Sequence, residues 1–260
     1  MTTIPVYIVD AFTRRPFGGN PAAICPLEAW LPEAQMQAIA TEHNLAETAF
    51  IVNEPDGWRI RWFTPTIEVD LCGHATLAAA HVLHQHRGYT ADEVVFQSRS
   101  GPLPVRFAGE RIVLDFPARP AARCEVPAAL REGLGVNPLE VRRSRDYLVV
   151  VADEEAVRAI APDFARLASL DCLGVIVTAP GREVDFVSRF FAPRAGIDED
   201  PVTGSAHCTL TPYWAARLHK RELTARQVSR RGGDLFCTLA GDRVHIGGHA
   251  VTYLTGTAVL

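Results

Sequence analysis

Hydrophobic and polar positions along the chain predict a succession of strands and helices. Short apolar runs rich in β-branched and aromatic residues, such as Val6–Phe12, Glu47–Val52 and Trp58–Phe63, are typical of strands. Longer stretches with apolar residues at helical spacing predict helices. One of them begins with Pro32 near its first turn and ends at Asn44.

The remaining expected elements follow from the same patterns. Further strands are expected at Val94–Gln97, Leu103–Phe107, Ile112–Phe116, Tyr147–Val151, Val175–Thr178 and Asp185–Phe191, with four more between Ala225 and Leu260. Helices are expected at Leu31–His43, from Gly73 to about Arg87, at Ala128–Leu134, at Glu154–Leu170 with an interruption near Pro162, and at Ser205–His219. Pro212 is expected to kink the last of these helices or to mark a late start.

A segment in the first half of the chain is repeated in the second half. RWFTPTIEVDLCGHAT, at Arg61–Thr76, matches RFFAPRAGIDEDPVTGSAH, at Arg189–His207. Each copy reads as a strand, a loop and the start of a helix. The likeness continues beyond the helices, because Ser98–Leu114 resembles Ser229–Ile246. The chain therefore consists of two related halves, which differs from a short-period repeat array.

Length and composition agree with two domains. The chain has 260 residues, of which 48% are hydrophobic, enough for two packed cores. We expect domains over residues 1–118 and 119–260, with Pro117–Pro127 as the linker between them. Val251–Leu260 has no counterpart in the repeat and is a candidate to cross back to the first domain.

The two repeated helix starts are candidate anion-binding sites. Cys72-Gly73-His74 matches Thr203-Gly204-Ser205, and the free backbone amides and dipole at a helix start favour a carboxylate or a phosphate. The alternatives are that Ser205 merely caps its helix and that His74 lies on the surface. Because both residues occupy duplicated positions, we expect them to bind a ligand.

Two carboxylates are candidates for proton transfer. Glu47 starts a strand where the other half has Val175, and Asp200 precedes the second helix start. Carboxylates on opposite walls of a cleft between the domains are able to take and return a proton. The alternative is that Asp200, its neighbours Asp198 and Glu199, and Glu47 are all solvated.

Cys72 raises a different possibility. A thiolate at a helix start is a good base or nucleophile, but a two-thiol racemase needs a second cysteine, and the matching residue is Thr203. Cys208 lies one turn further along, so a two-thiol mechanism is disfavoured. The turn-rich segment RRPFGGNP brings Asn20 forward as a candidate ligand contact, with an ordinary turn as the equal alternative.

Several classes of ligand and location lack support. The net charge is −4 with no basic run, so we expect no nucleic acid partner. No window is long and apolar enough for a membrane helix. His81, His84 and His86 lack an adjacent acidic or cysteine partner, so we expect no metal, and no phosphate-binding glycine motif supports a nucleotide cofactor. Six cysteines without a framework spacing and no export signal indicate a cytoplasmic protein with reduced thiols.

The segments VDAF, GGNPAAIC, NLAETAF, FTPTIEVDLCGHAT and DEDPVTGSAH resemble those of the phenazine-biosynthesis isomerase (PhzF-like) family over nearly the whole chain. The resemblance implies an α+β fold of the diaminopimelate-epimerase type. Such a fold has two pseudo-symmetric domains, each a curved sheet or barrel wrapped around a central helix, with the active site between them. It also implies an enzyme without metal or organic cofactor that commonly forms a homodimer.

The resemblance also implies roles for individual residues. Glu47 matches the family's catalytic glutamate, and the supporting active-site residues match Gly73, His74, Asp200, Gly204 and Ser205. We therefore expect an isomerase that moves a proton on a small cyclic or amino carboxylate, with Asn20, Cys72 and Thr203 among the substrate contacts. An epimerase or racemase that uses Cys72 and a non-catalytic protein that binds a small metabolite are the alternatives. His207, which follows the TGSA turn, has no assigned role.

Overall fold

The computed structural model describes residues 2–260. The chain divides into two compact units. Unit 1 consists of the residues through Asp115 together with Gly247–Leu260, and unit 2 consists of Phe116–Ile246. No helix among the described residues is long and apolar enough to cross a membrane.

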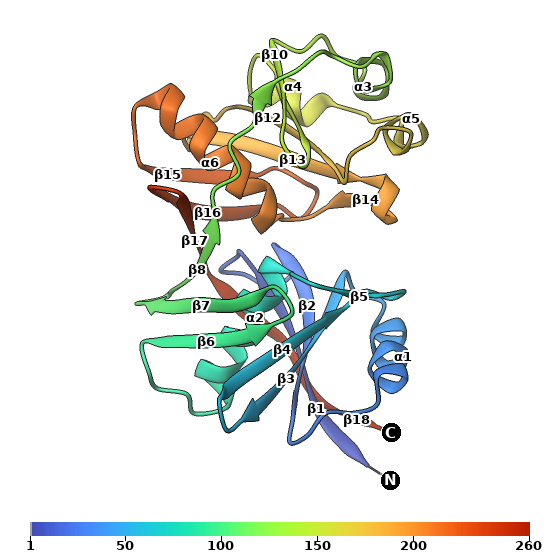
Figure 1. Ribbon diagram of the computed structural model, residues 1–260, viewed down its shortest axis with the longest axis vertical. Coiled ribbons are helices and arrows are strands. Elements are labelled where there is room, and N and C mark those ends of the chain that lie inside the picture. Colours follow the sequence, from blue (N-terminus) through green and yellow to red (C-terminus); the bar gives the residue numbers. More distant parts are fainter. Residues whose placement is uncertain (1) are drawn as a thin grey trace. The chain divides into compact units, whose positions relative to one another are not determined.

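Unit 1 is a strongly curved sheet around one helix (Figure 1). Its elements are β1 (Thr3–Ala11), β2 (Asn20–Leu27), α1 (Glu33–His43), β3 (Glu47–Glu54), β4 (Gly57–Phe63), β5 (Glu68–Val69), α2 (Gly73–His86), β6 (Glu93–Ser98), β7 (Gly101–Ala108), β8 (Arg111–Pro117) and β18 (Ala250–Val259). The central helix is α2, which packs against β1, β2, β3 and β18. Nine of its residues between His74 and Leu83 are buried, so α2 is a core helix, as its apolar content predicts.

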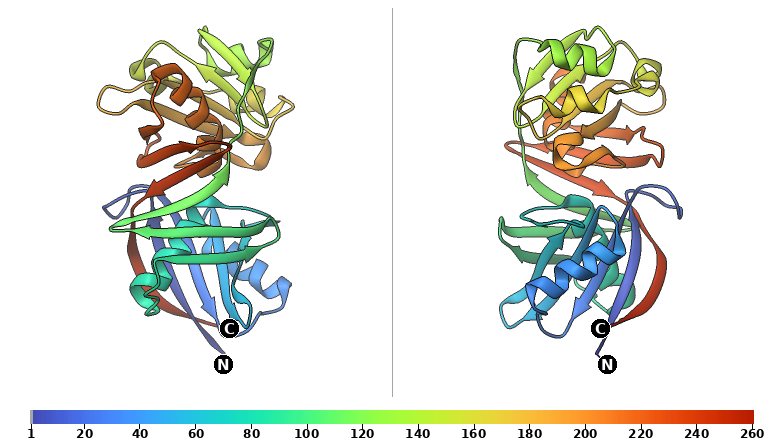
Figure 2. Two further views of the ribbon diagram at one scale, coloured as in Figure 1. Left: turned by 60° about the vertical axis from the view of Figure 1, so that its left-hand side comes forward. Right: turned by 90° about the vertical axis from the view of Figure 1, so that its right-hand side faces the viewer.

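The two ends of the chain lie side by side in unit 1. β18 pairs antiparallel with β1 from Thr3 opposite Val259 to Ala11 opposite Ala250 (Figure 2). β1 then pairs antiparallel with β2, and β2 pairs parallel with β3. The last strand therefore completes the sheet that the first strand begins.

Unit 2 repeats this plan. Its elements are β9 (Ala122–Arg123), α3 (Ala128–Leu134), β10 (Glu140–Arg143), β11 (Tyr147–Val150), α4 (Glu154–Ala159), α5 (Phe164–Ala168), β12 (Val175–Pro180), β13 (Phe186–Ala192), the 3₁₀ turn η1 (Pro193–Ala195), β14 (Ile197–Asp200), α6 (Gly204–Leu218), β15 (Glu222–Gln227), β16 (Gly233–Ala240) and β17 (Arg243–Gly248). The central helix is α6, which packs against β15 and β16. Nine of its residues are buried.

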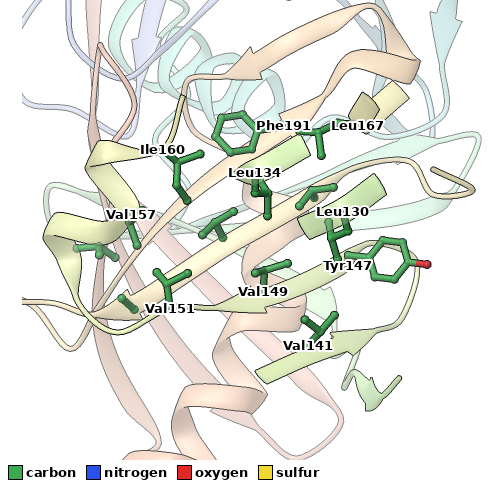
Figure 3. Close-up of a cluster of buried hydrophobic side chains, with 14 of the residues drawn as sticks. Leu130, Leu134, Val141, Tyr147, Val149, Val151, Val157, Ile160, Leu167 and Phe191 are labelled. Atoms are coloured by element: carbon green, nitrogen blue, oxygen red, sulfur yellow. The ribbon is translucent and has the colours of Figure 1, made fainter. Parts of the chain in front are cut away.

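The strand pairing confirms the repeat that the sequence predicts. β3 and β4 are antiparallel and β4 and β6 are parallel, just as β12 and β13 are antiparallel and β13 and β15 are parallel. The parallel pairs β2–β3 and β11–β12 also correspond. On the other face of the unit 2 sheet from α6, α3, α4 and α5 enclose a cluster that includes Leu134, Val149, Val157, Leu167 and Phe191 (Figure 3).

Pro212 lies inside α6, which begins at Gly204 and not late. Proline has no N–H, so the carbonyl of Cys208, four residues earlier, lacks its helical donor. The backbone N–H of Arg119 donates to this carbonyl at 2.8 Å. The segment between β8 and β9 thus satisfies the carbonyl that Pro212 leaves without a helical donor.

Some elements differ from the prediction. Residues Asn20–Leu27 form β2, where the sequence analysis expected only the turn that ends at Pro21. The acidic loop contains the short strand β14. The interruption expected near Pro162 is confirmed, because the helical stretch Glu154–Leu170 is divided into α4 and α5.

Candidate active sites at the starts of α2 and α6

In unit 1, a compact polar group forms at the first turn of α2. Cys72 is the N-cap residue, and its side chain makes no capping hydrogen bond. It therefore leaves the first backbone N–H groups of α2 available to a ligand. Gly73 is the first helical residue and His74 the second. His74 is only 4% exposed, so the alternative of a surface histidine is wrong.

Glu47 and Asn20 approach His74 from the sheet. Glu47 is the first residue of β3 and lies opposite Ala22 of β2, two residues after Asn20. Its Oε2 lies 3.2 Å from His74 Nε2, and its side chain is 13% exposed. The buried amide of Asn20 lies 3.1 Å from His74 Nδ1. The structure therefore brings Asn20, Glu47, Cys72, Gly73 and His74 together.

The charges of this group are coupled. Burial lowers the pKa of His74, but Cys72 and the Glu47 carboxylate act in the opposite direction and leave that pKa well above its usual value. Burial and the same carboxylate raise the pKa of the Cys72 thiol, although His74 opposes them. Cys72 Sγ lies 3.5 Å from His74 Nδ1. The Glu47 carboxylate therefore favours the protonated forms of both His74 and Cys72.

Two atoms of this group are unusually available for chemistry. Among the described residues, Glu47 Oε2 and His74 Nε2 are buried but make no well-directed hydrogen bond, in spite of their 3.2 Å contact. Buried polar atoms are normally paired, and exceptions are often functional. A proton or a substrate group is the natural partner for them.

In unit 2, Thr203 is held in place before the first turn of α6. Its backbone N–H donates to Gln227 Oε1 at 2.9 Å, and Gln227 Nε2 donates to the Asp200 carbonyl at 2.7 Å and to Thr203 Oγ1 at 3.2 Å. The Thr203 hydroxyl in turn donates to Asp200 Oδ2 at 2.5 Å. Because the amide and the hydroxyl of Thr203 are already hydrogen-bonded, the groups available to a ligand at the helix start are those of Gly204 and Ser205.

His207 contributes a further bond to the same residue. Its Nδ1–H donates to the Thr203 carbonyl at 2.8 Å, which places the lone pair of the neutral ring on Nε2. The ring is fully buried, and burial lowers the pKa of His207 to about 4 even though the Thr203 bond opposes the shift. His207 is therefore a neutral support of the helix start.

The acids of this loop have different surroundings. Glu199 pairs with both Nε and Nη2 of Arg189, at 2.7 and 2.9 Å, as Glu68 pairs with Arg61 in unit 1. It is a structural ion pair, so the expectation of three solvated acids is wrong for Glu199. Asp200 is half-buried and is oriented by Thr203.

The structural repeat shows a reciprocal exchange of carboxylates. Glu47 and Val175 are the first residues of β3 and β12, and they face Ala22 and Tyr147 in the matching parallel pairs. If Glu68 is aligned with Glu199 through their matching arginine pairs, Asp200 corresponds to Val69. Each unit thus carries one carboxylate where the other carries valine.

The same alignment reveals a residue that the sequence analysis missed. Asn20 precedes Ala22 by two residues, and Arg145 precedes Tyr147 by two residues, so the two positions correspond. Arg145 Nη2 donates to Ser205 Oγ at 3.0 Å, just as the amide of Asn20 contacts His74. Ser205 follows the N-cap by two residues and is therefore not the cap itself.

Arg145 is positioned by an acid. Its guanidinium pairs with Asp146, whose side chain is only 2% exposed, at 3.0 Å. The start of α6 thus combines backbone amides, a hydroxyl and a partly exposed guanidinium. This combination suits a carboxylate.

Two histidine-containing groups are candidates for a metal site. His81 and His86 both contact the Thr252 hydroxyl, at 3.0 and 2.7 Å, and His84 bonds the Tyr89 carbonyl. Within residues 2–260, the one set of three potential ligands close enough to share an ion is Glu47, Cys72 and His74, whose ligand atoms lie within 4.8 Å of one another.

Known proteins share the sequence and the architecture of this chain. A family model described as phenazine biosynthesis-like protein (PhzC-PhzF) matches residues 9–256. An uncharacterized isomerase of Pseudomonas aeruginosa is 59% identical over 249 residues, which cover 95% of each chain. The crystal structure of a PhzF-family phenazine biosynthesis protein from Enterococcus faecalis is 50% identical, covers 100% of both chains and gives a TM-score of 0.98.

A more distant structure shares the fold alone. A hydroxyproline epimerase from Agrobacterium vitis, crystallised with trans-4-hydroxy-L-proline, is 11% identical with a TM-score of 0.61 and is matched over 99% of this chain and 93% of its own. The fold is therefore the α+β architecture of two pseudo-symmetric domains that epimerases of this type also have. The chain belongs to the phenazine biosynthesis-like (PhzC-PhzF) family, and its enzyme class is isomerase.

Proposed function

We propose that the protein moves a proton between carbons of a small cyclic or amino carboxylate by general acid–base catalysis, without a metal or an organic cofactor. The observation that carries this proposal is the buried contact between Glu47 and His74 at the start of α2. A carboxylate and an imidazole with available atoms at 3.2 Å form a typical acid–base pair.

Glu47 is the proposed base that removes the proton and returns it at a second carbon. His74 Nε2 faces Glu47 and is placed to stabilise its charged form or to exchange a proton with the substrate. Asn20 fixes the orientation of the ring from the Nδ1 side. The amide of Gly73, at the positive end of α2, would stabilise the negative charge that develops when the carbon is deprotonated.

The start of α6 is the proposed anchor for the substrate carboxylate. The amides of Gly204 and Ser205, the Ser205 hydroxyl and the Arg145 guanidinium provide the donors. Asp200, held by Thr203, would accept a hydrogen bond from an amine or hydroxyl of the substrate. We propose Cys72 and Thr203 as further contacts of the substrate.

Two alternatives remain distinguishable. An epimerase that uses Cys72 needs a thiolate, but burial and Glu47 raise the pKa of this thiol, and its counterpart Thr203 has its hydroxyl bound to Asp200. A non-catalytic binding protein would keep the carboxylate anchor but would not exchange carbon-bound protons. The homodimer and the cytoplasmic location stay predictions.

The test is a screen for carbon–hydrogen exchange in deuterium oxide. The protein is incubated with a panel of amino- and hydroxy-cyclohexadiene carboxylates and cyclic amino acids, and proton NMR follows the loss of carbon-bound signals. We expect deuterium to enter at least one compound that binds. A compound that binds with micromolar affinity and takes up no deuterium would favour the binding protein.

A further inference from the structure

We propose that Glu47, Cys72 and His74 form a binding site for a thiophilic divalent cation such as Zn²⁺, and that occupancy of this site blocks proton transfer. The three side chains provide a carboxylate oxygen, a thiol sulfur and an imidazole nitrogen. These are the donor types that zinc prefers in proteins.

The distances within the group match those of a tetrahedral site. With metal–sulfur and metal–nitrogen bonds of about 2.3 and 2.0 Å, a tetrahedral ion separates the two ligand atoms by about 3.5 Å. Cys72 Sγ and His74 Nδ1 are 3.5 Å apart. The backbone of the α2 start therefore already holds this pair at the spacing that an ion requires.

The third ligand comes from the adjacent strand. Glu47 at the start of β3 has an oxygen within 4.8 Å of the other two ligand atoms. A single ion binds only one of the two ring nitrogens of His74. Because Glu47 Oε2 faces His74 Nε2, coordination at Nδ1 requires the Glu47 carboxylate to rotate toward Cys72. This rotation gives up the 3.2 Å contact between Glu47 Oε2 and His74 Nε2, and the bond to the ion would replace it.

The group is shielded from water. Cys72 and His74 are 6% and 4% exposed. The buried Asn20 amide now contacts Nδ1, and an ion at this nitrogen would replace that contact. Rotation of the amide about its terminal torsion would turn its oxygen inward as a fourth donor. Cation binding displaces the protons of Cys72 and His74, so affinity should rise with pH.

The consequence for activity rests on the proposed function, but the binding does not. A bound cation would hold the Glu47 carboxylate that transfers the proton and would turn it away from His74 Nε2. The protein would then be inhibited by free zinc without needing any metal for turnover. Removal of zinc by a chelator would restore activity.

Cobalt(II) chloride is a suitable probe, because a Co²⁺ ion bound to thiolate gives a near-ultraviolet charge-transfer band. We expect one equivalent of Co²⁺ to produce this band in the chelator-treated full-length protein, and one equivalent of Zn²⁺ to abolish it. Cys72→Ser should lose the band and weaken zinc binding by more than the roughly 10–100-fold that loss of an outer-shell partner costs. Zinc affinity is measured by competition with a fluorescent chelator.

Two further variants complete the test. Cys124→Ser removes a part-exposed thiol of unit 2 and should bind Co²⁺ and Zn²⁺ as the parent does. Glu47→Gln keeps the thiol and should retain the band with weaker zinc binding, which covers the case in which Cys72→Ser fails to fold. Equal zinc affinity in the parent, Cys72→Ser and Glu47→Gln, or a cobalt complex without the thiolate band, would overturn the proposal and leave the acid–base function untouched.

Discussion

The burial of His207 leads to a prediction about how the stability of unit 2 depends on pH. Its ring is fully buried and its pKa is lowered from 6.5 to about 4, chiefly by burial. His207→Asn retains a side-chain N–H that can donate to the Thr203 carbonyl, but it removes the titrating ring. We expect the variant to lose the part of the pH dependence of stability that His207 causes.

The sign follows from proton binding in the two states. The unfolded chain binds a proton at His207 below about pH 6.5, whereas the folded protein does not until about pH 4. Folding is therefore fully stabilised by this group above pH 6.5 and loses that stability as the pH falls toward 4. At about 1.4 kcal/mol per tenfold change, the total is about 3 kcal/mol, of which about 2 kcal/mol is lost between pH 7.5 and pH 5.

Amide hydrogen exchange in α6 measures this loss within unit 2 after correction for the intrinsic exchange rate at each pH. His207→Asn should be less stable than the parent at pH 7.5, because the smaller side chain leaves a cavity, but should lose about 2 kcal/mol less on acidification. His219→Asn is the matched control, since His219 is exposed and adopts the left-handed conformation that asparagine tolerates at a helix end. If all three proteins lose the same stability between pH 7.5 and pH 5, the buried neutral state of His207 is refuted.

The remaining predictions concern unit 2. Arg145→Gln removes a charged donor at the start of α6 and should weaken benzoate binding, measured by calorimetry, by about 10–100-fold. The control Arg182→Gln, at an exposed ion pair, should bind benzoate as the parent does. Equal benzoate affinities of the two variants would remove Arg145 from the site. Gln227→Ala should cost about 1–3 kcal/mol in urea unfolding, because the Thr203 N–H is left buried without its acceptor, and Gln85→Ala on the exposed side of α2 should cost far less. A Gln227→Ala protein as stable as Gln85→Ala would show that the Thr203 bonds are dispensable.

The sequence predicted the two central helices because their apolar content is higher than that of surface helices. It also predicted their equivalence, since the repeated segments end at the same helix position. The sequence analysis named Glu47 and His74 as separate candidates and did not predict their contact. These residues, 27 positions apart, meet because α2 packs against β3, which local patterns do not reveal.

The sequence did not predict Arg145 or the strand β2. Arg145 lies in a polar turn with no motif of its own, and it becomes recognisable only when the strand register aligns it with Asn20. β2 contains Pro21 and Pro26, which disfavour strands in isolation, but the sheet on both sides supplies the pairing. The role of His207 likewise depends on tertiary burial.

The central claim is that Glu47 transfers the proton, and Glu47→Gln tests it most directly. Once the screen has given a substrate, the parent, Glu47→Gln and Cys72→Ala are compared by proton NMR in deuterium oxide. The account predicts that Glu47→Gln folds like the parent and exchanges carbon-bound protons slower by about 10²–10⁴-fold or more, while Cys72→Ala keeps most of the rate. Exchange at the parental rate in Glu47→Gln, together with an inactive Cys72→Ala, would contradict the account and assign the proton transfer to the thiol.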